Sequence, residues 1–168
     1  NNDVPGLLEF FTTPDGASSP TEKMAILPSG GITFNGDRST ANALDDYEEG
    51  TWTPTLNASV STAVASGTYT KIGRTVHYQF QIGNSISDIT STTTIELDGL
   101  PYNPSAGMAT GAAFGRFIDG GPFLVTYIGT GGNISIYEQS TGHFSNLEFA
   151  DFNNVSGYIY GQGQYETA

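Results

Sequence analysis

The segment from Arg74 to Ile82 constrains the fold most strongly, because its side chains alternate between two kinds without a break. Apolar residues at one parity take turns with polar residues at the other: Val76, Tyr78, Phe80 and Ile82 against Thr75, His77, Gln79 and Gln81. Successive side chains of a β-strand point to opposite faces of the sheet. One face of this strand is therefore predicted to join a core, and the other faces solvent or a partner. His77 lies on the polar face, and we interpret it as a surface or interface histidine.

Comparable strand signals recur along the chain from Thr51 onward, and no helix-length segment with a 3.6-residue period separates them. Besides Arg74 to Ile82, we expect strands at Trp52 to Asn57, Gly67 to Ile72, Thr92 to Leu97, Thr110 to Ile118, Phe123 to Ile128, Asn133 to Glu138, Phe144 to Phe152 and Val155 to Tyr165. With 22 Gly and only two Lys, the composition favours strands and turns over helices. The pattern indicates an all-β chain built as an antiparallel sandwich or barrel, and we expect a jelly-roll-like β-sandwich.

The N-terminal part differs from the rest of the chain in its pattern of apolar and charged residues. Its apolar runs, Leu7 to Thr13, Glu22 to Leu27 and Gly31 to Phe34, are too short and too few to close a core alone. The next segment, Asp37 to Gly50, carries five acidic residues and one Arg, which predicts a solvated connection or a short helix capped by Ser39 or Thr40. We therefore divide the chain into residues 1–50, an N-terminal part with an acidic connection, and residues 51–168, a β-sandwich head. Because it begins without Met, we expect it to be a fragment of a longer protein.

The net charge excludes several classes of partner. Seventeen acidic residues against five basic ones give a formal charge of −12, which repels nucleic acid and anionic membranes. The uncharged stretch from Gly120 to Tyr137 is too rich in Gly and polar residues to be a membrane helix. The absence of Cys excludes disulfides, a thiolate nucleophile and Cys-ligated zinc. We expect neither nucleic-acid binding nor membrane insertion.

Residues that could carry catalysis do not form a recognisable constellation. The acidic pairs Asp45-Asp46 and Glu48-Glu49 could supply the two carboxyl groups of a glycosidase or the oxygens of a weak calcium site, but a solvated charge run explains them better. The two histidines stand far apart, and the sequence motifs of hydrolases, zinc proteases and nucleotide-binding loops are missing. We expect no enzyme activity, no cofactor and no metal.

Aromatic side chains are the other candidates, because sugar rings stack on them. We expect Trp52 to be buried as the anchor of the first head strand, and Phe80, Phe123 and Phe149 to be core residues. Tyr137, Tyr158 and Tyr160 fall on the parity opposite to the aliphatic residues of their strands. Their face is either wet or covered by another subunit, and its lack of Lys and Glu favours a subunit interface.

One stretch of the chain resembles a family of phage fibre proteins. The residues that carry the resemblance are Glu22-Lys23-Met24, Gly30 to Asp37 (GITFNGD after the first Gly), Ala43 to Pro54 (ALDDYEEGTWTP), Gly67 to Val76 (GTYTKIGRTV) and Leu97 to Tyr102 (LDGLPY). In that family the LDDYEEGTWTP stretch opens a C-terminal receptor-binding domain. The resemblance covers Glu22 to about Pro104, whereas Ser105 to Ala168 matches nothing in it.

The resemblance implies a homotrimeric virion appendage, a tail or head fibre, whose β domain attaches to a host-surface glycan or protein. It further implies that residues 1–50 are the end of a stalk of intertwined strands joined to the rest of the fibre, with the acidic run as the junction. The alternative function is a carbohydrate-binding module or a depolymerase-type spike acting on surface polysaccharide.

A receptor site is expected on loops of the C-terminal half, since binding residues favour loops displayed by a rigid scaffold. The candidate segments are Asp119 to Gly121, Gly131 to Asn133 and Gln139 to Phe144, although each could be a simple hairpin turn. The third is favoured because its six residues exceed what a tight turn needs and include one of the two histidines. The candidate receptor-binding residues are Tyr137, Gln139, His143, Phe144, Asp119 and Asn133.

Overall fold

The computed structural model describes residues 5–57, 64–83, 92–105, 109–118, 123–129, 131–140, 142–152 and 156–167. The chain is all-β, and its contacts divide it into two compact units, Asn1–Tyr47 and Glu48–Ala168. Within the described ranges there is no helix with the length and apolar character needed to cross a membrane.

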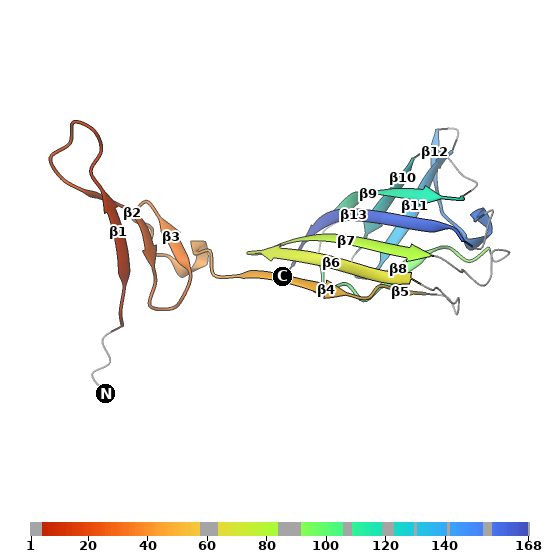
Figure 1. Ribbon diagram of the computed structural model, residues 1–168, viewed down its shortest axis with the longest axis horizontal. Coiled ribbons are helices and arrows are strands. Elements are labelled where there is room, and N and C mark those ends of the chain that lie inside the picture. Colours follow the sequence, from red (N-terminus) through yellow and green to blue (C-terminus); the bar gives the residue numbers. More distant parts are fainter. Residues whose placement is uncertain are drawn as a thin grey trace. The chain divides into compact units, whose positions relative to one another are not determined.

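The N-terminal unit holds a three-stranded antiparallel sheet in the order β1-β2-β3, formed by β1 (Leu8–Thr12), β2 (Thr21–Ile26) and β3 (Ile32–Phe34) (Figure 1). These strands coincide with the apolar runs of the sequence. A 3₁₀ turn, η1 (Thr40–Asn42), follows them with Ser39 at its N-cap, as the short-helix alternative predicts, but the Ser39 side chain makes no capping hydrogen bond. The Asp37 carboxylate organises the turn instead, since it accepts 2.8 Å hydrogen bonds from the Ser39 N–H and the Asn42 amide.

The second unit is one curled antiparallel sheet (Figure 1). Its path runs β4-β6-β7-β13-β9-β10-β11-β8-β5, and β12 pairs with β11 off this path. The strands are β4 (Tyr47–Trp52), β5 (Thr55–Leu56), β6 (Val64–Ile72), β7 (Thr75–Gly83), β8 (Glu96–Asp98), β9 (Ala109–Arg116), β10 (Leu124–Ile128), β11 (Ile134–Ser140), β12 (His143–Asn146) and β13 (Tyr158–Glu166). The strand next to the C-terminus, β13, lies in the middle of the sheet between β7 and β9.

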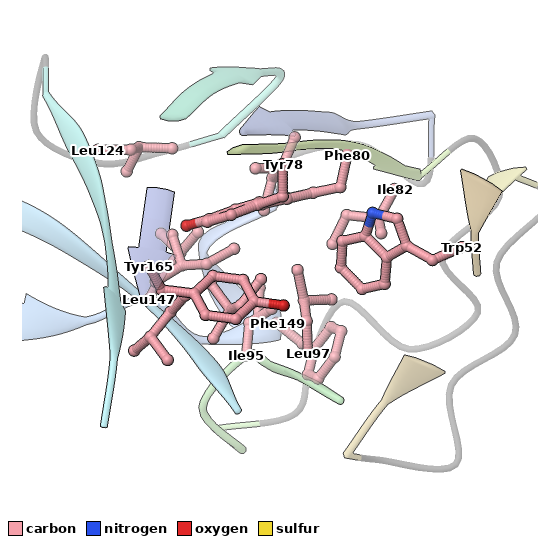
Figure 2. Packing of buried hydrophobic residues seen from close by; sticks show 14 of the residues in the cluster. Trp52, Tyr78, Phe80, Ile82, Ile95, Leu97, Leu124, Leu147, Phe149 and Tyr165 are labelled. Carbon is pink, nitrogen blue, oxygen red and sulfur yellow. The ribbon is translucent and has the colours of Figure 1, made fainter. Parts of the chain in front are cut away.

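The curl of the sheet encloses a core of aromatic and aliphatic side chains (Figure 2). The alternation predicted for β7 is confirmed, because Val76, Tyr78, Phe80 and Ile82 are all buried. Trp52 is also buried, with 8% of its surface exposed, as expected for an anchor. The Tyr78 hydroxyl and the Thr126 hydroxyl lie 3.0 Å apart in the interior and join β7 to β10. Side chains from distant strands therefore meet inside one sheet.

Two glycines make room for these rings. A Cβ placed on Gly67 of β6 would lie 2.1 Å from Trp52 Nε1, and one placed on Gly161 of β13 would lie 2.2 Å from Phe80 Cζ. Real Cβ atoms do not approach other atoms so closely, so the rings of Trp52 and Phe80 lie flat over glycine backbone in the neighbouring strands. This packing explains why apolar alternation in β13 is interrupted by Gly at interior positions.

Other sequence predictions are wrong. The acidic connection becomes a strand at Tyr47, because β4 pairs along β6 and the Glu48 carboxylate accepts hydrogen bonds from the Tyr69 hydroxyl of β6 and from the Tyr102 hydroxyl. The strand expected over Phe144 to Phe152 ends at Asn146, and Phe149–Asp151 form a 3₁₀ turn with a reciprocal cap between Glu148 and Asp151. Phe149 is buried as predicted, whereas Phe123 is 65% exposed and is not a core residue.

Candidate functional site

The outer face of the curled sheet has little charge. We define it by the side chains of β6, β7, β13, β9, β10 and β11 that alternate with the buried ones. Registered pairs place these side chains in rows across the strands, and one row runs through Thr68, Gln79, Gln162, Ala112, Val125 and Tyr137. A second row runs through Ser66, Gln81, Tyr160 and Phe114. Neither of these two rows contains an ionisable acid or base apart from tyrosine.

Exposed aromatic rings continue the second row toward the end of the sheet. Ala113 pairs with Leu124, which brings Phe114 opposite Phe123, the residue just before β10. The Gln139 N–H donates a 3.1 Å hydrogen bond to the Phe123 carbonyl. Gln139 in turn pairs with Phe144 of β12, so Phe144 extends the same row. Tyr160, Phe114, Phe123 and Phe144 are 40%, 65%, 65% and 59% exposed, and we call these four residues the aromatic row.

A surface hollow of about 590 Å³ lies beside Phe144. Its lining residues are Thr110, Gly111, Val125, Thr126, Tyr127, Tyr137 and Phe144. The rings of Tyr127 and Tyr137 meet edge to face, with centroids 6.2 Å apart and an interplanar angle of 87°. Tyr127 and Tyr137 are half-buried, and Phe144 projects from the neighbouring hairpin. The hollow offers ring faces for stacking together with hydroxyl groups that can donate or accept hydrogen bonds.

The structure brings together three of the candidate receptor-binding residues and separates two others from them. Gln139 pairs with Phe144, and Tyr137 lies two residues before Gln139 on the same face of β11. His143 pairs with Ser140, one position along from Gln139, and so lies on the opposite face. Asn133 is half-buried just before β11, away from the aromatic row. Asp119 lies outside the described residues.

The loop expected at Gln139 to Phe144 is a tight hairpin, because both Gln139 and Ser140 pair with residues of β12. Sequence reasoning also missed Phe114 and Tyr127 as members of the site, and it named Tyr160 as an outward-facing aromatic residue without including it among the receptor-binding candidates. Parity could have found Phe114, since it alternates with half-buried Ala113 and Gly115. The opposite parity predicted for Tyr160 is confirmed, because Ile159 beside it is buried and Tyr160 stacks on Tyr158 at the surface with centroids 5.9 Å apart.

The acidic residues serve a structural purpose at Glu48. Its carboxylate accepts hydrogen bonds from the hydroxyls of Tyr69 and Tyr102, whose rings meet edge to face. These bonds, the one from Tyr102 first, lower the pKa of the Glu48 carboxyl below its ordinary value. A general acid needs the reverse shift, so Glu48 is poorly suited to protonate a leaving group. Lys71 lies over the Tyr102 ring at 5.2 Å from its centroid.

This cluster gathers residues from separate parts of the fibre resemblance: Glu48 from the EEG run, Tyr69 and Lys71 from GTYTKIG, and Tyr102 from GLPY. The resemblance therefore falls on side chains that fix β4 to β6.

No three or more His, Asp or Glu side chains gather into a metal-binding group within the part of the chain that the structure describes. Comparisons with protein-family models, curated proteins and solved structures found no match.

Proposed function

We propose that this chain is the non-enzymatic tip of a bacteriophage fibre, which attaches the virion to a glycan on the surface of its host. The observation that carries the proposal is the hollow beside Phe144, where exposed rings border Tyr127 and Tyr137 on a face with little charge. Soluble proteins rarely leave several large aromatic side chains exposed together unless the surface binds something. The resemblance of Ala43 to Pro54 to the opening of phage fibre receptor-binding domains supports the same function.

The chemistry of the hollow suits a sugar. The apolar C–H faces of a pyranose ring stack on aromatic rings, while its hydroxyls exchange hydrogen bonds with amides and hydroxyls. Phe144, Tyr127 and Tyr137 supply the rings, and the Thr110 hydroxyl and the Gln139 amide supply polar partners at or near the hollow. The surrounding rows contain no Lys or Arg that could bind an anionic sugar, and the formal charge of −12 on the chain repels anions. Both features favour neutral glycans over strongly anionic ones.

The proposal includes an assembly. The curled sheet would be a jelly-roll-like sandwich, and three copies of the chain would form a homotrimer whose N-terminal units continue into the rest of the fibre. Uncharged outer rows, such as Thr68, Gln79 and Gln162, support contacts between subunits, because charged residues are depleted at the centre of protein interfaces. The interior contact between Tyr78 and Thr126 supports the sandwich, since it joins β7 to β10 across the core.

Binding to intact cells tests the proposal. Labelled protein is incubated with a panel of bacterial strains before and after the cells are treated with periodate, which oxidises glycans, or with protease. We expect attachment to a subset of strains that is lost after periodate and kept after protease. Attachment that survives periodate but is lost after protease would contradict a glycan receptor, and attachment to none of the strains would count against the adhesin.

A matched pair of variants assigns the attachment to the hollow. The double variant Tyr137→Ala/Phe144→Ala should lose attachment while keeping its circular dichroism spectrum. Phe117→Ala removes a different exposed Phe, outside the aromatic row, and should attach normally. Undiminished attachment by the folded double variant would move the receptor site elsewhere.

A further inference from the structure

The N-terminal sheet has one face that its own chain covers in part, where Phe11 stays 51% exposed, and an opposite face that it leaves open. Arg38, after β3, donates hydrogen bonds to Glu9 in β1 and to Glu22 in β2, with 2.6 Å between Arg38 Nη1 and Glu22 Oε1. Glu9 pairs with Ala25, which pairs with Thr33, and both Ala25 and Thr33 are buried. The segment that follows β3 therefore closes back on the side of the sheet that carries Glu9, Ala25 and Thr33.

The opposite side carries apolar residues in two registered rows. One row runs Leu8, Ile26, Ile32 and Leu44, and the other runs Phe10, Met24 and Phe34. We call these seven residues the apolar face. Five of them are strongly exposed in the single chain: Leu8 at 54%, Phe10 at 44%, Ile26 at 40%, Phe34 at 53% and Leu44 at 42%. Met24 and Ile32 are half-buried.

This unit has too small a core to hold its fold alone. Of its described residues, only Ala25 and Leu27 are buried apolar side chains. Domains of about 60 residues are already marginal, and smaller ones need disulfides, metals or association. The chain has no Cys, so no disulfide supplies the missing stability. The strands therefore need a partner that is present whenever the chain is folded.

We infer that the apolar face is the surface through which copies of this chain pack against one another, with the same face of each copy buried in the contact. A second copy is a protein partner that is present with every folded chain, and like apolar faces complement one another without matched charges. Arg38 pairs with both Glu9 and Glu22 within the chain and balances one of these two carboxylates, and none of the seven residues of the apolar face is charged. The inference rests on the proposed homotrimer for the number of copies and assigns the surface that holds it.

Mass in solution tests the inference on the full chain. Light scattering at micromolar concentration should give about 53 kDa for three chains of 17.7 kDa each. The variants Phe10→Asp and Ile26→Asp place a charge within the apolar face and should lower the mass to about 18 kDa, that of one chain. The matched control Ser29→Asp adds the same charge at an exposed turn between β2 and β3 and should keep the trimer mass.

Alanine variants distinguish loss of association from misfolding caused by a buried charge. Phe10→Ala and Phe34→Ala introduce no charge and should raise the concentration of half-dissociation at least tenfold. Trp52, the only Trp of the chain, reports separately on the head, so its fluorescence should be the same in every variant as in the wild type.

The measured masses distinguish a failure of the proposed homotrimer from a failure of the apolar face as its contact surface. Wild-type protein at 18 kDa would contradict both the homotrimer and this surface, and its flotation with neutral phosphatidylcholine vesicles would make a lipid surface the occupant of the apolar face. Wild-type protein at 53 kDa with unchanged mass and dissociation in the Asp and Ala variants would overturn the assigned surface and leave the trimer standing.

Discussion

The indole nitrogen of Trp52 donates a 3.2 Å hydrogen bond to the backbone carbonyl of Gln79, two strands away in the sheet. The ring itself lies over the backbone of Gly67 in β6, the strand between them. Trp52 thus binds β4 to the centre of the head through both packing and a directed bond. This arrangement gives the Gly-Thr-Trp-Thr-Pro run a structural role at the start of the second unit, Glu48–Ala168, which we call the head.

Replacing Trp52 should destabilise the head strongly. Trp52→Ala removes a buried ring and leaves a cavity, at a cost of about 3 to 5 kcal/mol in the free energy of unfolding. Trp52→Phe keeps most of the apolar area but lacks the N–H donor for Gln79, so it should cost less. Urea unfolding followed by circular dichroism measures both. A folded Trp52→Ala protein of normal stability that no longer attaches to cells would identify Trp52 as a binding platform instead.

Gly161 and Gln162 are neighbours in β13 with opposite expected responses to the same change. In Gly161→Val the new side chain meets the Phe80 ring, and overpacking of this kind typically costs about 1 to 3 kcal/mol. Gln162→Val places the same side chain on the exposed outer face and should change the unfolding free energy little. Thermal and urea unfolding of the two variants provide the measurement. Equal stability of both would contradict the close packing of Phe80 on β13.

The buried hydroxyls of Tyr78 and Thr126 should behave as a coupled pair. Tyr78→Phe and Thr126→Val each leave one buried hydroxyl without its partner, and each should cost about 1 to 3 kcal/mol. The double variant removes both hydroxyls, so it should cost less than the sum of the two single changes. A double-mutant cycle of urea unfolding gives the coupling energy. Strict additivity would mean that this bond contributes nothing.

Glu48 should make stability depend on pH in a defined direction. Hydrogen bonds from Tyr102 and Tyr69 lower the Glu48 pKa in the folded protein from its ordinary value of 4.5. The stabilisation is therefore present above pH 4.5 and is lost as the pH falls through the lower folded pKa. Comparing wild type with Glu48→Gln in urea between pH 7 and pH 2 should show a stability difference that shrinks across that range.

The variant Tyr69→Phe/Tyr102→Phe keeps the Glu48 carboxylate but removes both donors. Carboxyl chemical shifts followed by NMR during acid titration should give a higher Glu48 pKa in this variant than in the wild type. The same pKa in both proteins would show that the tyrosines do not stabilise the carboxylate.

The sequence predicted the parts of the fold that depend on local alternation of apolar and polar residues. It failed where contacts with residues far along the chain determine burial or strand formation. The buried face of β7 followed from period-two patterning alone, because Tyr78 and Phe80 have polar neighbours on both sides. By contrast, Phe123 looks apolar and strand-like locally, yet it falls on the outer parity of its strand. The strand at Glu48 was missed for a related reason, since its acidic side chain is satisfied by Tyr69 and Tyr102, which lie far along the chain.

The candidate site was predictable only in part. Tyr137, Gln139 and Phe144 were placed near one another by their closeness in sequence, and the hairpin keeps Gln139 and Phe144 paired. His143 was grouped with them because the segment was interpreted as a loop, whereas strand pairing puts it on the other face. The contribution of Tyr127 depends on the register between β10 and β11, which no local pattern specifies.

The most direct test of the attachment function is a glycan array probed with the full chain. We expect the wild-type protein to bind one class of neutral glycan, and Tyr137→Ala/Phe144→Ala to lose that binding while Phe117→Ala retains it. An array on which the folded wild-type protein binds no glycan, or on which the double variant binds as well as the wild type, would contradict the proposed role of the hollow in receptor attachment.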